Sequence, residues 1–179
     1  MEHFFETREE ASRAAADRIA DALERRLELQ KAASLVVSGG SSPVQCFEVL
    51  AHKDLDWGRV GVLPSDDRWV PSDHDDSNEK LVRGSLLVNG ASNADLLPFY
   101  AEGATAEERA AALDKEIRFV PFPFACSLLG MGTDGHFASL FPDAENLDEG
   151  LDLESSVLCL PVQTEAWPYP RISLTRAAR

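Results

Sequence analysis

Hydrophobic and polar positions follow two different spacings along this chain. Over residues 7–33, apolar residues recur every three or four positions among many glutamates and arginines, which predicts a long amphipathic helix with a solvated charged face. The short apolar runs at residues 34–38 and 57–63 each contain two valines and predict strands. Shorter helical patterns follow these runs, over residues 44–50, 78–88 and 105–117.

Further strand patterns occur in the second half of the chain. Residues 96–100 predict a short edge strand, because Pro98 cannot donate to a sheet ladder. Apolar runs at residues 121–129, 157–162 and 171–175 predict the remaining strands. Since strands alternate with helices, we expect an α/β fold: a three-layer, Rossmann-like, mostly parallel sheet with helices on both faces. We expect residues 1–179 to form a single domain.

The stretch at residues 129–142 combines a glycine-rich turn with two side chains that are candidates for catalysis. An apolar run ends in three glycines within six residues, which then present Asp134 and His136. The pattern predicts a strand, a tight turn and a helix that starts near Gly135, because glycine accepts positive φ and close approach of a ligand. In open α/β sheets, ligands bind at this edge. Alternatively, Asp134 caps the helix and His136 is an ordinary surface or core histidine.

A second strand-to-helix turn, residues 38–43, is rich in serine and glycine. Its polar groups can cradle a phosphate; they are the hydroxyls of Ser38, Ser41 and Ser42 and the backbone N–H groups around Gly39 and Gly40. The turn is neither a Walker A loop nor a dinucleotide-binding motif. The alternative is an ordinary turn between a strand and a helix that a serine caps.

A third polar cluster, Asp66, Asp67 and Arg68, comes where the strand at residues 57–63 ends. The guanidinium of Arg68 can bind phosphate or carboxylate through its planar fork. Alternatively, the two aspartates form a turn and a salt bridge to Arg68. Because the carboxyl ends of parallel strands meet at one edge of a sheet, we expect all three polar turns to converge there.

Charge and cysteine content exclude several classes of partner. The chain has 17 basic and 31 acidic side chains, a net charge of −14, and its basic residues are scattered, so neither nucleic acid nor an anionic membrane is an expected partner. Its three cysteines lack Cys-x-x-Cys spacing and are typical of reduced thiols, not of a disulfide frame or metal site. With no signal-peptide pattern and no apolar run of about twenty residues, we expect a cytoplasmic protein.

Four segments, residues 38–43, 65–78, 130–142 and 171–175, together resemble the glucosamine-6-phosphate isomerase/6-phosphogluconolactonase family, and within it the lactonases. They occur in the family's order and at similar separations over nearly the whole chain. The resemblance implies the NagB/RpiA-like fold and hydrolysis of 6-phospho-D-glucono-1,5-lactone to 6-phospho-D-gluconate in the oxidative pentose phosphate pathway. It also implies that the substrate is a phosphosugar lactone and that neither a cofactor nor a metal is needed.

The resemblance also implies residue roles. His136 is similar to the catalytic base, with Asp134 beside it and Asp66 as the acidic partner. The positions that match substrate and phosphate binding are Gly39, Gly40, Ser41, Ser42, Arg68 and Arg171, although Arg171 alternatively only anchors the last strand. Neutral imidazole can deprotonate a water that adds to the lactone carbonyl. Ser139 is expected within a helix and not as a nucleophile, because there is no Gly-x-Ser-x-Gly elbow.

The sequence departs from the family at its end. The family continues beyond the segment at residues 171–175 through another strand and helix that carry a basic residue, so we expect lower stability, self-association or weaker phosphate affinity. One alternative function is therefore a phosphosugar-binding protein without turnover. A glucosamine-6-phosphate deaminase is less favoured, since those enzymes have a different sequence after Asp-Gly-His, and an unrelated α/β domain is least favoured.

Overall fold

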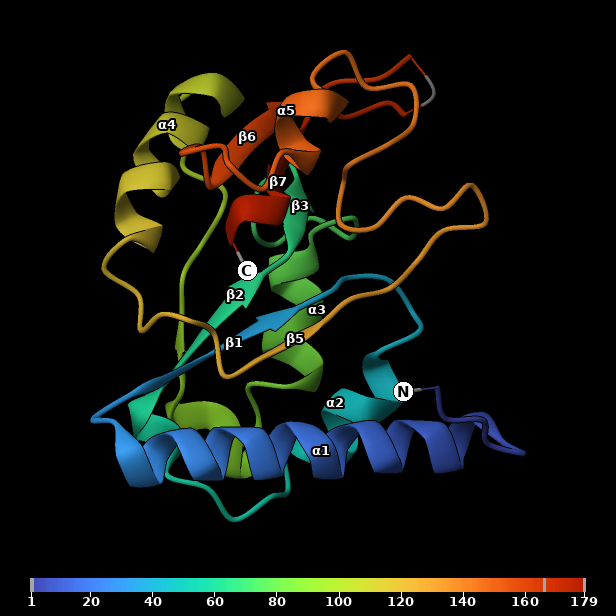
Figure 1. Cartoon of the computed structure of the whole chain (residues 1–179), viewed down its shortest axis with the longest axis vertical. Coiled ribbons are helices and arrows are strands. Elements are labelled where there is room, and N and C mark those ends of the chain that lie inside the picture. The colour runs from blue at the N-terminus through green and yellow to red at the C-terminus, as the bar shows by residue number, and fades with distance from the viewer. Residues whose placement is uncertain (1, 166, 179) are drawn as a thin grey trace.

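A parallel sheet of four strands forms the centre of the computed structural model, which describes residues 2–165 and 167–178 (Figure 1). The strand order is β4-β2-β1-β5. Every residue of β1 is buried, as expected for a strand covered on both faces. The predicted α/β architecture with a parallel sheet is confirmed. The strands are β1 (Ala33–Val37), β2 (Val60–Pro64), β4 (Asp95–Leu96) and β5 (Cys126–Leu128).

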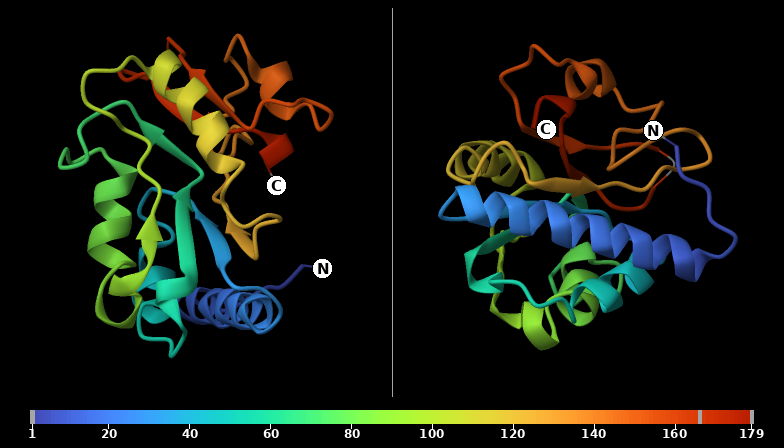
Figure 2. Two further views of the ribbon diagram at one scale, coloured as in Figure 1. Left: turned by 90° about the vertical axis from the view of Figure 1, so that its left-hand side faces the viewer. Right: turned by 60° about the horizontal axis from the view of Figure 1, so that its bottom comes forward.

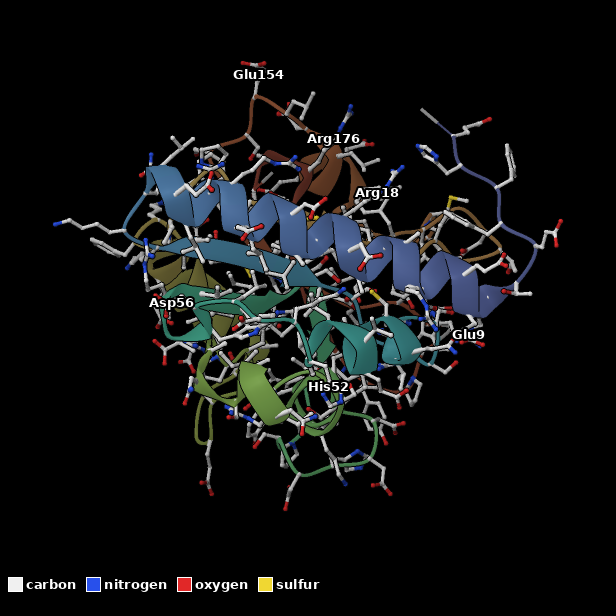
Figure 3. All side chains as sticks on the ribbon, turned by 90° about the horizontal axis from the view of Figure 1, so that it is seen from below. Glu9, Arg18, His52, Asp56, Glu154 and Arg176 are labelled. Carbon is white, nitrogen blue, oxygen red and sulfur yellow. The ribbon has the colours of Figure 1, made fainter. Side chains whose placement is uncertain are left out.

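Three helices cover one face of this sheet: α1 (Arg8–Leu29), α2 (Val44–Leu50) and α3 (Asn78–Ser85). They enclose the larger core with Leu35 and Val37 of β1. Figure 3 shows α1 lying across this side of the molecule, with the exposed side chains of Glu9 and Arg18 on its outer surface. The amphipathic pattern of residues 7–33 therefore predicted both the helix and its buried face.

The other face of the sheet contacts α4 (Ala106–Ile117) and a second sheet (Figure 2). Val36 and Leu63, the strand residues on this face, join the second core. The second sheet is antiparallel in the order β3-β7-β6. Its strands are β3 (Asp66–Arg68), β6 (Cys159–Val162) and β7 (Arg171–Leu174). The sequence did not predict this separate sheet.

Ser65 joins the two sheets. Its N–H donates to the carbonyl of Val37 at 2.7 Å, and its own carbonyl accepts the N–H of Leu174 at 2.8 Å. The chain therefore passes at this residue from the parallel sheet into the antiparallel one. As a result, the strand β3 and its partner β7 lie at the carboxyl edge of the parallel sheet, where β1 and β2 end.

Hydrogen bonds at the helix ends explain where α4 begins and where α1 ends. The helix α4 begins with a capping box: the Thr105 side chain accepts the N–H of Glu108, whose side chain accepts the N–H of Thr105. The first helix ends at Leu29, earlier than expected, and the guanidinium of Arg59 binds the carbonyls beyond it. None of the described helices is long and apolar enough to cross a membrane. The short elements are η1 (Trp57–Arg59), η2 (Asn89–Asn93), α5 (Leu147–Leu151) and η3 (Arg176–Ala178).

Candidate active site

An open pocket of about 250 Å³ lies at the carboxyl edge of the parallel sheet. Seven of the nine residues that the sequence proposes for the site line it: Gly39, Gly40, Ser42, Asp66, Arg68, His136 and Arg171. Ser41 does not; its carbonyl accepts a hydrogen bond from Arg8 at 2.6 Å. Asp134 is likewise outside the lining and contacts His136. The structure thus brings the three polar turns together.

The glycine-rich turn after β5 closes on itself. The N–H of Gly132 donates to the carbonyl of His136 at 2.8 Å, and the N–H of Gly135 donates to Gly132 at 3.0 Å. Gly135 has a φ of 87°, in the left-handed region that glycine accepts. A Cβ on Gly132 would lie 2.3 Å from two atoms of the His136 ring. Glycine at position 132 therefore makes room for the imidazole.

The prediction of a helix that starts near Gly135 is wrong. Residues 137–140 form a tight turn closed by a bridge between Phe137 and Leu140, with Ala138 at a φ of 50°. The carboxylate of Asp134 accepts the N–H of His136 at 3.2 Å, so it closes a turn instead of capping a helix. Ser139 therefore lies in this turn and not in a helix.

His136 and Asp134 form a hydrogen-bonded pair, with Nδ1 of the imidazole 2.6 Å from Oδ1 of the carboxylate. The hydrogen bond from His136 lowers the pKa of Asp134, so the carboxylate is ionised at neutral pH. Because an ionised carboxylate only accepts hydrogen bonds, Nδ1 carries a proton, and in the neutral form of the ring the lone pair is on Nε2. The ring of Phe141, centred 4.3 Å from the imidazole centre, packs against it.

Asp66 is buried and held by hydroxyl groups. Its two carboxylate oxygens accept from the hydroxyls of Ser65 at 2.8 Å and Ser139 at 2.6 Å. Nη1 of Arg171 lies 3.7 Å from the same carboxylate and donates to the Ser139 hydroxyl at 3.4 Å. Ser139 thus links Asp66 to Arg171, a role that the sequence did not suggest.

Arg171 is both a strand residue and a pocket residue. It is 8% exposed, and its Nε has no hydrogen-bond partner among the residues that the structure describes. The guanidinium carbon lies 5.1 Å from the ring centre of Phe141 and 5.3 Å from that of Trp167. Burial, and then the positive charge of Arg68, lower the pKa of Arg171. The site therefore holds a buried cation whose charge is partly offset by Asp66, at 3.7 Å, and by the more distant carboxylates of Asp67 and Asp76.

Asp67 points away from the pocket, because alternate residues of a strand face opposite sides. Its carboxylate accepts the N–H of the adjacent Arg68 at 2.8 Å and, at the start of α3, the N–H groups of Asn78 and Glu79 at 2.7 and 2.9 Å. Burial nevertheless raises the pKa of Asp67 to about 6. The alternative was a salt bridge from the Arg68 side chain to Asp66 or Asp67. Among the described residues, that side chain instead donates to the backbone carbonyl of Asp76 and to the amide oxygen of Asn78.

Sequence reasoning missed Asn78 and Arg8 as site residues. Asn78 lines the pocket, accepts from Nη1 of Arg68 at 2.6 Å and donates to the carbonyl of Asp66 at 2.7 Å. Its place directly after Ser77, which caps α3, was the available signal. Arg8 precedes the whole sheet in sequence, so no local pattern connects it to the turn at residues 38–43.

No cysteine is among the residues that line the pocket. Burial raises the pKa of Cys46 to about 11 and also raises that of Cys159, so both thiols stay protonated. Within residues 2–165 and 167–178, no group of three or more His, Cys, Asp or Glu side chains is placed to hold a metal ion. The groups that the pocket offers are an imidazole, a carboxylate, two guanidinium groups, the Asn78 amide and the polar atoms of the turn at residues 38–43.

Comparison with known proteins identifies the family. The family described as glucosamine-6-phosphate isomerases/6-phosphogluconolactonase matches residues 6–178. A 6-phosphogluconolactonase from Pseudomonas aeruginosa is 42% identical over 168 residues, which cover 94% of this chain and 71% of the relative. One from Mesorhizobium japonicum is 40% identical over 97% of this chain and 73% of the relative. The chain belongs to the glucosamine-6-phosphate isomerase/6-phosphogluconolactonase family.

Solved structures support the same assignment. The crystal structure of a 6-phosphogluconolactonase from Shewanella baltica superposes with a TM-score of 0.93 at 38% identity, over 97% of this chain and 74% of that one. A relative at this identity and coverage shares the fold in detail, so the NagB/RpiA-like fold expected from the sequence is confirmed. The chain spans about three quarters of the length of the Shewanella baltica protein.

Proposed function

We propose that the chain hydrolyses 6-phospho-D-glucono-1,5-lactone to 6-phospho-D-gluconate. The observation that carries the proposal is the hydrogen bond that joins Nδ1 of His136 to Asp134, in the same pocket as Arg68 and Arg171. A neutral imidazole suits the activation of water, and two guanidinium groups suit a phosphorylated substrate. The named relatives are 6-phosphogluconolactonases, whereas none of those compared above is a deaminase.

The reaction requires one water and no covalent enzyme intermediate. Nε2 of His136 accepts a proton from the water as its oxygen adds to the lactone carbonyl, which gives a tetrahedral oxyanion. The bond between that carbon and the ring oxygen then breaks, and the imidazolium returns the proton to the ring oxygen. Asp134 holds the ring and stabilises its positive charge. The new carboxylic acid then ionises, so the net change is water added and one proton released.

The remaining site residues bind and orient the substrate. Arg68 and Arg171 bind the phosphate group and the sugar hydroxyls together with Gly39, Gly40 and Ser42, while Ser41 completes their turn outside the pocket lining. Such remote contacts supply binding energy that holds the lactone carbon near the water. Asp66 is the acidic partner of Arg171. Because the chain carries a net charge of −14, these local cations are needed to attract an anionic substrate.

Domain organisation, location and partners are inferred from the sequence and from the exposed surface. We infer that residues 1–179 act as one domain, in the cytoplasm and without a nucleic-acid partner, as the composition indicates. We also infer self-association, because several large apolar side chains are exposed, among them Leu29 and Phe119.

An assay of lactone opening tests the proposal. Freshly generated 6-phosphogluconolactone is added to the 179-residue chain, and formation of 6-phosphogluconate is followed above the spontaneous rate. The proposal predicts catalytic turnover at micromolar enzyme or less. If the chain binds 6-phosphogluconate in calorimetry but gives no rate above background, the alternative of a phosphosugar-binding protein without turnover replaces it.

A further inference from the structure

Asn78 joins three parts of the site. Its side-chain oxygen accepts from Nη1 of Arg68 at 2.6 Å, its side-chain nitrogen donates to the carbonyl of Asp66 at 2.7 Å, and its backbone N–H donates to Asp67 at 2.7 Å. The residue is 2% exposed. The two side-chain bonds fix the plane of the amide, because each bond needs its own end of the group.

The amide of Asn78 also packs against the turn after β1. A Cβ on Gly39 would lie 1.9 to 2.4 Å from the amide oxygen, carbon and nitrogen. The backbone of Gly39 and the amide therefore occupy adjoining space in which only glycine fits. Asn78 consequently sets the positions of Arg68 and of the turn at residues 38–43 together.

The partners of Arg68 leave its charge free. The guanidinium donates to the Asn78 amide oxygen and, at 3.3 Å, to the carbonyl of Asp76, and both acceptors are neutral. The adjacent carboxylate of Asp67 is occupied by backbone N–H groups at the start of α3. Thus the geometry holds the guanidinium in place, and among the described residues no ion pair cancels its charge.

We propose that Asn78 is a positioning residue that orients Arg68 toward the phosphate of the substrate while keeping the positive charge of the guanidinium available. This proposal deepens the function proposed above and rests on it. An aspartate at position 78 would hold Arg68 equally well but would neutralise it, and would place a carboxylate oxygen against the Asp66 carbonyl. Asparagine is therefore the residue that meets both requirements.

Steady-state kinetics of Asn78→Asp test this role. With 6-phosphogluconolactone, we expect KM to rise about tenfold or more while kcat stays within about threefold, since one charged contact to phosphate is weakened. With unphosphorylated glucono-1,5-lactone, KM should change less than about threefold. The matched control is Asn93→Asp, which makes the same change at an exposed position and should leave both substrates unaffected. Equal effects of Asn78→Asp on the two lactones would overturn the proposal.

A double-mutant cycle keeps the test independent of folding defects. Gly39→Ala displaces the Asn78 amide, so Gly39→Ala and Asn78→Ala remove the same contact to Arg68, and their effects on KM should not add. Additive effects would contradict the shared contact. Binding of 6-phosphogluconate, measured by calorimetry, separates this proposal from the proposed function. If the wild-type chain lacks turnover, lactonase activity fails, and unchanged affinity in Asn78→Asp would still overturn the role of Asn78.

Discussion

Arg68 and Arg171 lie directly opposite each other across the antiparallel pair β3 and β7. Both line the pocket, and the positive charge of Arg68 contributes to the lowered pKa of Arg171. Like charges at facing strand positions are destabilising. The two positive charges therefore repel each other at a place where a bound anion would relieve the repulsion. This arrangement is typical of an anion-binding site.

This facing pair predicts how phosphate stabilises the fold. Inorganic phosphate at about ten times its Kd should raise the Tm of the wild-type chain by about 3 to 5 °C. In Arg68→Met, the shift should fall to about a third or less, while the Tm without phosphate is unchanged or higher because the repulsion is removed. Arg25→Met, an exposed position on α1, is the control. Thermal melts that show the same phosphate shift in Arg68→Met and wild type would contradict an anion site at Arg68.

The pair formed by Asp134 and His136 predicts a moderate loss of rate in Asp134→Asn. The amide can still accept from Nδ1, but it cannot stabilise the imidazolium and permits the other tautomer. Because the Asp134 side chain is 47% exposed, water screens its charge, and we expect kcat to fall only about tenfold with little change in KM. A kcat within twofold of wild type in the lactone assay would show that the carboxylate does not assist His136.

The close approach of Gly132 to the imidazole predicts that Gly132→Ala lowers kcat by about tenfold or more, because the added methyl group displaces the ring. Gly84→Ala is the matched control. Gly84 lies in α3 with nothing near its Cβ position, so this change should leave kcat unaltered and stabilise the fold by about 0.5 to 1 kcal/mol. Equal kcat values for the two variants would mean that the ring position at residue 136 does not limit the reaction.

The raised pKa of Asp67 predicts how stability depends on pH. With a folded pKa of about 6 and an unfolded value near 3.9, the folded protein keeps a proton that the unfolded chain releases, so this group's contribution to the free energy of unfolding falls as pH rises from about 4 to about 6. Asp67→Asn lacks this contribution. Compared with wild type, the variant should therefore be destabilised by about 2 kcal/mol more at pH 4.5 than at pH 7. Urea unfolding at both pH values measures the difference, and an equal or reversed difference would contradict a raised pKa.

Local patterns predicted most of the fold. The helices α1 and α4 and the parallel strands follow from spacings that span only a few residues. The antiparallel sheet could not be predicted in this way. Its strand β3 consists of Asp66, Asp67 and Arg68, which show no apolar pattern, and it pairs with β7 about a hundred residues later in the chain. Such pairing depends on tertiary contacts such as those of Ser65.

The site was predicted in composition but not in detail. Sequence identified His136, Asp66 and Arg68 because polar residues follow predicted strands, whereas Arg171 was suggested only by the family resemblance. It gave the wrong structure after Gly135, since the hydrogen bonds of Asp134 to His136 favour a turn over the helix that the residue pattern indicates. It also missed Asn78. Its hydrogen-bond partners Arg68 and Asp66 lie ten and twelve residues earlier, and Gly39, against which its amide packs, lies in the turn after β1.

The most direct test of the account is the lactonase rate of His136→Ala beside that of wild type. The exposed His52→Ala is the control, since it removes an imidazole away from the pocket. If Nε2 of His136 activates the water, kcat for 6-phosphogluconolactone should fall by about a hundredfold or more in His136→Ala, with 6-phosphogluconate still bound, and stay unchanged in His52→Ala. A His136→Ala variant that retains turnover within about twofold of wild type would contradict the proposed catalytic base.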